Sequence, residues 1–198
     1  MWKDAEKFLS EDKYIGPLIK KWGNVQIKKT PRTKYFENLF ESIVNQQLSG
    51  KAASTIFGRV KKLCKGKISP GVILKISDEK LRSAGLSHQK ISYVKDLAYK
   101  VKRREINIEN NDSLSDEEII EELIKVKGIG RWTAEMFLMF SLARPDIFPI
   151  DDLGIKKGFE KVTGKSWDKE KSAKLAKKHW SPYRTVASWY LWRSLENR

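Results

Sequence analysis

Apolar residues recur with helical spacing along almost the whole chain, and this periodicity limits the fold more than any other feature. One run places its apolar residues at the i, i+3, i+4, i+7 and i+8 positions of a single helix face: Phe36, Leu39, Phe40, Ile43 and Val44. The segments VQIKK and INIEN come closest to strands, but both are too short to anchor a sheet. The sequence therefore predicts an all-α fold of roughly ten short helices.

Two helix starts can be placed from the sequence. In SLSDEEIIEELIKV, a serine and an acidic first turn precede an apolar face, which is the pattern of a capped helix. Ser49 is predicted to cap another helix. The side of that helix predicted to face the core carries Ala52, Ala53, Ile56 and Val60.

Charge and cysteine content narrow the class of protein. Lys and Arg number 40 against 25 Asp and Glu, so the formal charge is +15. This excess fits either a nucleic-acid partner or a lysine-rich solvated surface, and composition does not choose between them. A single cysteine, Cys64, excludes a disulfide framework, a cysteine zinc site and a four-cysteine iron–sulfur cluster. No apolar run approaches the ~20 residues of a membrane span, and the charged start lacks a signal-peptide core, so we expect a soluble intracellular protein, cytoplasmic or nuclear.

The stretch KVKGIGRWTAEMF, residues 125–137, places a Gly-Ile-Gly turn before an apolar helix. Because Gly128 and Gly130 lack side chains, backbone N–H groups of the turn can approach an anion, and the helix that follows begins there with its partial positive charge. Such a turn suits a DNA phosphate, and its carbonyls can coordinate a monovalent cation. The alternative is an ordinary αα-hairpin in which the glycines only permit the turn.

A second stretch, FPIDDLGIKKGF, places two acidic residues at the start of another helix. An acidic residue in that position usually caps the helix, and this role accounts for one of the pair. The other requires a separate explanation.

These two stretches together resemble the helix-hairpin-helix, Gly/Pro-rich loop and aspartate signature of the DNA glycosylase superfamily, and specifically the 3-methyladenine DNA glycosylase II branch. Three further segments fit that branch in order and spacing: FESIVNQQLSGKAA, AGLSHQKISYVKDLA and YRTVASWYLWRSL. The resemblance covers about residues 33 to 195. It implies two helical lobes flanking a cleft, residues 1–34 with 150–198 and residues 35–149, the latter with the hairpin at 119–142.

The resemblance also implies the roles of single residues. Asp152 matches the catalytic aspartate, and Asp151 is then expected to be a helix cap. An ionised Asp152 would stabilise positive charge at C1′ of the deoxyribose and orient or deprotonate the attacking water. Trp132 and Trp192, with Met136 at a position often aromatic in relatives, are expected to line a pocket for a cationic alkylated base, where each cation–π contact contributes about 0.5–2 kcal/mol.

DNA contacts are expected at two places. The hairpin turn would bind the backbone, and either Gln47 or Leu48 would be inserted where the damaged base has left the stack. The turn residues are Lys127, Gly128, Ile129, Gly130, Arg131 and Thr133. No cofactor is expected to be required, although a monovalent cation could bind the carbonyls of Ile124, Val126 and Ile129.

Bifunctional relatives have a lysine at the position of Trp132, and its amine attacks the sugar. The tryptophan therefore implies a monofunctional hydrolase that leaves an abasic site, acting as a monomer on double-stranded DNA with alkylated bases. Two alternatives stay open: a non-catalytic hairpin DNA-binding module, and a glycosylase/lyase for oxidised bases that uses a relocated lysine.

Overall fold

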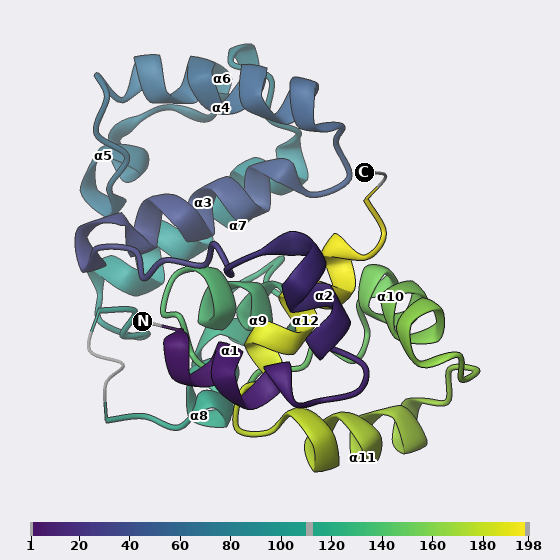
Figure 1. The fold of residues 1–198 in the computed structure, drawn as a ribbon. Coiled ribbons are helices and arrows are strands. Elements are labelled where there is room, and N and C mark those ends of the chain that lie inside the picture. Colours follow the sequence, from purple (N-terminus) through teal and green to yellow (C-terminus); the bar gives the residue numbers. More distant parts are fainter. Residues whose placement is uncertain (1, 110–112, 197–198) are drawn as a thin grey trace. The chain divides into compact units, whose positions relative to one another are not determined.

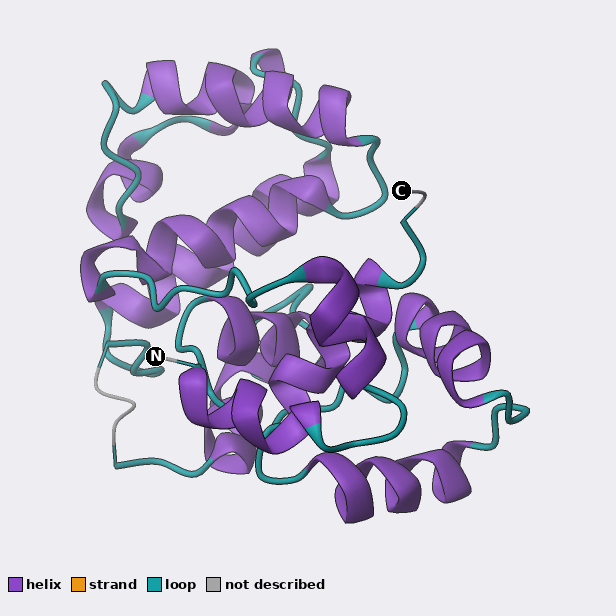
Figure 2. Cartoon of the chain, in the orientation of Figure 1, coloured by secondary structure: helices purple, strands orange, loops and turns teal. Residues whose placement is uncertain are grey.

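The structure is a computed structural model that describes residues 2–109 and 113–196 (Figure 1). In this part of the chain, twelve α-helices and one 3-10 helix form, and no strand occurs (Figure 2). The predicted all-α fold is confirmed. In chain order the helices are α1 (Lys3–Ser10), α2 (Gly16–Trp22), η1 (Arg32–Lys34), α3 (Tyr35–Asn45), α4 (Gly50–Leu63), α5 (Pro70–Lys75), α6 (Asp78–Ser83), α7 (His88–Lys102), α8 (Asp116–Ile124), α9 (Arg131–Phe140), α10 (Leu153–Thr163), α11 (Lys169–Trp180) and α12 (Arg184–Arg193).

The chain divides into two compact units, Met1–Lys29 with Leu138–Arg198, and Thr30–Phe137. In the first unit, α12 packs against α1, α2, α10 and α11. The core of this unit includes the fully buried side chains of Trp180, Tyr190 and Phe159. Phe159 is on α10, Trp180 on α11 and Tyr190 on α12, so this core joins the three helices. The lobe boundaries expected from the resemblance, and the cleft between the lobes, stay predictions.

In the second unit, α3 packs against α4 and α7. The predicted apolar face of α3 is buried throughout, as the exposures of Phe36, Leu39, Phe40, Ile43 and Val44 show. On α4, Ala53 and Val60 are buried and Ile56 is half-buried, but Ala52 is exposed, so its predicted inward position was wrong. Ala52 is one residue before Ala53, about 100° away around the helix, and therefore points off the packed face.

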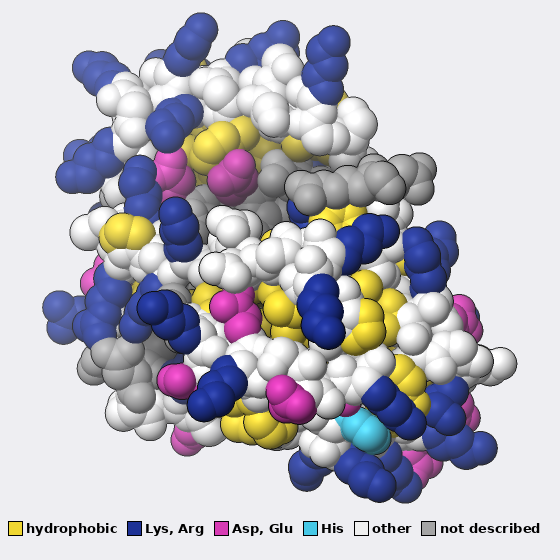
Figure 3. Space-filling model, viewed as in Figure 1, with side chains coloured by type: hydrophobic (Ala, Val, Ile, Leu, Met, Phe, Trp, Pro, Cys, Tyr) yellow, Lys and Arg dark blue, Asp and Glu magenta, His cyan; other side chains and the backbone are white. Residues whose placement is uncertain are grey.

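The two predicted helix starts differ in their capping. The capped start predicted for α8 is confirmed, and Ser115 and Glu118 form a reciprocal capping box there. Ser49 occupies the N-cap position of α4, but its side chain makes no capping hydrogen bond. None of the helices in the described part of the chain is long and apolar enough to cross a membrane. Lys and Arg side chains are spread over the face shown in Figure 3 and do not gather in one patch on it.

Candidate functional site

The Gly-Ile-Gly turn joins α8 to α9 in the second unit, and its two glycines have different roles. Gly128 has a φ of +81°, and a Cβ there would lie 2.0 Å from Cδ2 of Tyr93, so only glycine fits. A Cβ on Gly130 would meet nothing within 4 Å. The first glycine is therefore needed for the turn itself, whereas the second leaves the outer surface of the turn open.

Hydrogen bonds of the turn show which backbone groups remain available to an anion. The N–H of Lys127 donates to Oδ2 of Asp96 at 2.8 Å, and the N–H of Ile129 donates to the carbonyl of Val126 at 3.1 Å. Within residues 2–109 and 113–196, the N–H groups of Gly128 and Gly130 donate no hydrogen bond. These two donors suit a phosphate, since such groups at a helix start are favourable to anions.

The charged side chains of the turn are not equivalent. Lys127 is exposed. Arg131 is engaged in a bidentate pair with Glu117, with both N···O distances 2.7 Å, and lies 3.4 Å from Glu135. The hydrogen bonds that Arg131 donates to Glu117 raise the pKa of Arg131, and the same bonds lower the pKa of Glu117. A phosphate must therefore compete with Glu117 for Arg131, a partner that sequence spacing did not reveal.

A cavity of about 510 Å³ lies beside the hairpin in the second unit. It brings together three residues that the sequence assigned to the base pocket or the wedge, namely Gln47, Trp132 and Met136. Trp132 is 46% exposed, which leaves its ring accessible from the cavity. Leu48 does not line the cavity, and its side chain is exposed. The other lining residues are Ser42, Asn45, Gln46, Gly128, Gly130 and Thr133.

Two hairpin residues expected at the DNA backbone are largely buried. Thr133 is buried and lines the cavity, and the side chain of Ile129 packs inward. Their side chains therefore hold the turn in place rather than face solvent. The carbonyl of Val126, one of the three expected at a cation, accepts the N–H of Ile129. In the described part of the chain there is no cluster of three or more His, Cys, Asp or Glu side chains that could hold a metal ion. The monovalent cation expected at the backbone carbonyls stays a prediction.

Asp152 lies in the first unit, at the N-cap of α10. Its Oδ1 accepts two hydrogen bonds of 2.8 Å, from the N–H of Ile155 and from the indole Nε1–H of Trp192. Asp151 is exposed and pairs with Nζ of Lys169 at 2.5 Å. The expectation that Asp151 is the cap was therefore wrong: the backbone turn directs the Asp152 carboxylate, not that of Asp151, toward the free N–H groups of the helix.

Gly154 makes the contact between Trp192 and Asp152 possible. A Cβ at this position would lie 2.7 Å from Cδ1 and 2.8 Å from Nε1 of the Trp192 ring. The ring of Trp192 also packs 5.9 Å from that of Phe140, at 33°. Sequence reasoning missed Gly154, although the glycine two residues after Asp152 was visible. Because Gly154 has no side chain, the Trp192 ring can come close enough for its indole N–H to donate a hydrogen bond to the Asp152 carboxylate.

Two neighbours of Trp192 on α12 pack in the core of the first unit. Tyr190 is fully buried, and its hydroxyl donates to the carbonyl of Gly23 at 2.8 Å. Trp189 packs edge-on against Tyr190 with ring centroids 4.9 Å apart.

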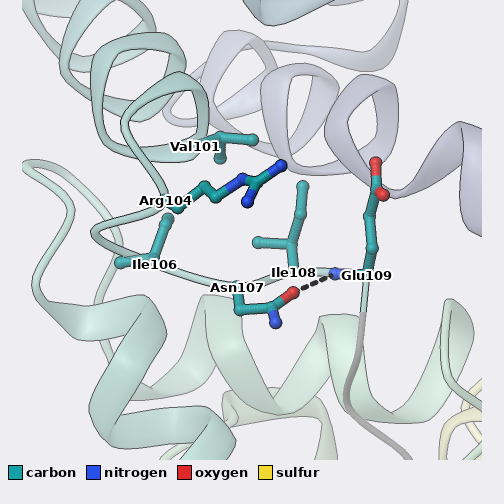
Figure 4. A pocket seen from close by; sticks show the side chains of 6 residues that line it. All are labelled: Val101, Arg104, Ile106, Asn107, Ile108 and Glu109. Atoms are coloured by element: carbon teal, nitrogen blue, oxygen red, sulfur yellow. Dashed lines mark hydrogen bonds between the residues drawn. The ribbon is translucent and has the colours of Figure 1, made fainter.

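A separate cavity lies at the end of α7 (Figure 4). The side-chain oxygen of Asn107 there accepts the N–H of Glu109 at 3.2 Å. None of the predicted site residues lines it, and its lining is formed by Val101, Arg104, Ile106, Asn107, Ile108 and Glu109.

The hairpin with its open glycine N–H groups, the cavity beside Trp132 and the carboxylate at the start of α10 are the features that the resemblance to DNA glycosylases led us to expect. Residues 40–182 match the family described as HhH-GPD superfamily base excision DNA repair protein, and the chain belongs to this family. It is similar to DNA-3-methyladenine glycosylase 1 of Schizosaccharomyces pombe, with 37% identity over 89% of this chain and 80% of the relative.

Two solved structures share the whole fold. The crystal structure of a DNA-3-methyladenine glycosidase from Bacillus halodurans has a TM-score of 0.86 and 37% identity, covering 97% of this chain and 88% of that one. The structure of the Schizosaccharomyces pombe 3-methyladenine DNA glycosylase in complex with abasic DNA has a TM-score of 0.84 and 37% identity, covering 97% and 96%.

Proposed function

We propose that the protein is a monofunctional DNA glycosylase that removes alkylated purines from double-stranded DNA by hydrolysing the N-glycosidic bond. The observation that carries this proposal is the carboxylate of Asp152, held at the start of α10 by the N–H groups of Ile155 and Trp192. A carboxylate fixed by two donors is oriented before substrate arrives, which is what an electrostatic contribution to catalysis requires. The names of the relatives support the choice of substrate.

The chemistry follows from the charge of the substrate. A purine methylated on a ring nitrogen is cationic, so when the bond to C1′ breaks, its electron pair neutralises the departing base. Positive charge then develops on the sugar, where the carboxylate of Asp152 stabilises it. A water adds to C1′ and gives up a proton, for which Asp152 is the acceptor. The products are a free base and an abasic site.

The hairpin cavity favours hydrolysis over a lyase reaction. A lyase needs an amine that attacks the sugar, and none of the nine residues that line the cavity is a lysine. Trp132 and Met136 instead offer an electron-rich aromatic ring and a polarisable thioether, which suit a cationic base. The proposed partner is duplex DNA whose backbone binds at the N–H groups of Gly128 and Gly130 and at Lys127.

Base release from methylated duplex DNA tests this function, with Asp152→Asn as the decisive variant. Asparagine caps a helix as well as aspartate, so the variant keeps its helix start and loses the charge. Release of 3-methyladenine or 7-methylguanine should fall at least about 100-fold, with DNA binding retained.

Asp151→Asn is the matched control, because it removes a neighbouring charge that pairs only with Lys169 among the hydrogen bonds of the described residues, and it should keep activity. If the wild-type protein releases no base yet binds DNA, the protein is a binding module. A borohydride-trapped covalent adduct would identify a lyase.

A further inference from the structure

Helix α7 is linked by hydrogen bonds to the loop at residues 46–48, which follows α3. Nζ of Lys90 donates to the carbonyls of Val44 and Gln46 at 2.7 and 2.6 Å. These carbonyls lie at the C-terminal end of α3, where the last carbonyls of a helix lack partners within it and the dipole favours a cation. Burial lowers the pKa of Lys90. An ammonium group partly removed from water is thus held by one carbonyl of the last turn of α3 and one of the loop.

Two more contacts complete a closed set that joins α7, this loop and the hairpin. Nε2 of Gln46 donates to the carbonyl of Gly128 at 2.7 Å. Oδ2 of Asp96, on the same helix as Lys90, accepts the N–H of Lys127 at 2.8 Å. The ring of Tyr93, also on α7, occupies the space beside Gly128, where a Cβ would lie 2.0 Å from its Cδ2. We call the three residues Lys90, Gln46 and Asp96 the loop brace.

The loop brace leaves the next two residues facing outward. Gln47 is exposed and has a φ of +56°, a left-handed conformation that a non-glycine residue keeps only where its surroundings impose it. The side chain of Leu48 is 37% exposed, so it is accessible to a ligand. Because Gln46 is fastened on both its carbonyl and its side chain, the direction of Gln47 and Leu48 is set relative to the hairpin.

We infer that Lys90, Gln46 and Asp96 are positioning residues that hold the residue 47–48 wedge at a fixed distance from the DNA backbone bound by the hairpin. This inference rests on the proposed function, because it concerns how a base leaves the duplex. Opening the stack costs free energy that an inserted side chain offsets. The offset is greatest when the wedge is already held in position, since a mobile loop must first be ordered.

The test is Lys90→Met, which keeps the length of the side chain and removes the ammonium group. Lys95→Met is the matched control: Lys95 is on the same helix and also donates to a backbone carbonyl, that of Ile76 at 2.6 Å, away from the wedge. Lys90→Met should slow single-turnover base release from duplex DNA by about tenfold or more, in proportion to the loss of hydrogen bonds made by a charged group. Lys95→Met should leave it near the wild-type rate.

Single-stranded methylated DNA separates positioning from a general structural effect, because there is no duplex stack for the wedge to open. We expect the loss in Lys90→Met to be much smaller on this substrate, the affinity for undamaged duplex to stay near wild type, and Lys90→Arg to recover part of the duplex rate. Equal losses on both substrates, or an equal loss in Lys95→Met, would overturn the inference.

If Lys90→Met does not fold, Gln46→Met carries the test, since it removes the link to Gly128 without burying a new charge. Its duplex rate should fall relative to its single-strand rate, and an unchanged ratio would overturn the inference.

If the wild-type protein releases no base, the proposed function fails, but 2-aminopurine fluorescence in duplex DNA still measures stack opening. That signal should be weaker with Lys90→Met than with Lys95→Met, and equal signals would refute the brace.

Discussion

Trp192→Phe distinguishes two roles that the site allows for Trp192. The indole donates its N–H to Oδ1 of Asp152 at 2.8 Å, and the ring packs 5.9 Å from that of Phe140. Phenylalanine keeps an aromatic ring at this position and removes the N–H. If Trp192 acts by orienting the carboxylate, the substitution should slow base release. If Trp192 acts only as an aromatic surface for the base, the substitution should leave most of the rate of base release.

The structure sets the size of the expected effect. A hydrogen bond to a charged group contributes about 1.5–3 kcal/mol. Since about 1.4 kcal/mol corresponds to a tenfold change in rate, losing this bond should slow the chemical step by about 10- to 150-fold. The hydrogen bond from Ile155 remains, so the helix cap survives and the protein should fold normally.

The assay is single-turnover release of 3-methyladenine from duplex DNA at saturating protein, alongside binding to DNA that contains an abasic-site analogue. The rate should fall while binding stays within about twofold, because the interaction with the carboxylate acts in the transition state. Trp189→Phe is the control, since the Trp189 ring packs on Tyr190. A full rate in Trp192→Phe, or a loss that appears only in DNA binding, would refute the positioning of Asp152 by the indole.

Two further predictions concern the hairpin. Glu117→Gln removes the charge that engages Arg131, so the affinity for undamaged duplex should rise, and the slope of log affinity against log salt should steepen by about 0.9 if one phosphate contact is gained. An unchanged slope would show that Arg131 does not reach a phosphate. Gly128→Ala should lower the free energy of unfolding by more than about 1 kcal/mol, because of its positive φ and the Tyr93 ring, whereas Gly130→Ala should change it by less than about 0.5 kcal/mol. Equal effects in denaturant titrations would contradict the assignment.

The helices could be predicted because their signals are local. The buried face of α3 and the capping box of α8 depend on residues within a few positions of one another, so periodicity and capping chemistry were sufficient. Ala52 shows the limit of this reasoning. Alanine is small and apolar enough to be accepted on either face near the start of a helix, and only the packing of α4 decides which face is buried.

The partners of the site residues could not be predicted, because they are distant in sequence. Glu117 is 14 residues from Arg131, Asp96 is 31 from Lys127, and Gln46 is 82 from Gly128. Such pairs depend on how the helices pack and leave no periodic signal. The neighbouring acids Asp151 and Asp152 posed a different problem, because both are good capping residues and only the backbone turn determines which carboxylate reaches the helix.

The glycines of the two motifs illustrate how one residue type can serve opposite purposes. Gly128 and Gly154 each make room for an aromatic ring, that of Tyr93 or that of Trp192, and each ring lies next to a group that the proposed reaction uses. Gly130 has open space around it instead, so its missing side chain benefits a ligand rather than the fold. The Gly-Ile-Gly turn therefore combines a glycine that the protein needs with one that only the bound DNA would need, which is why stability measurements and DNA-binding measurements should respond to different halves of the same motif.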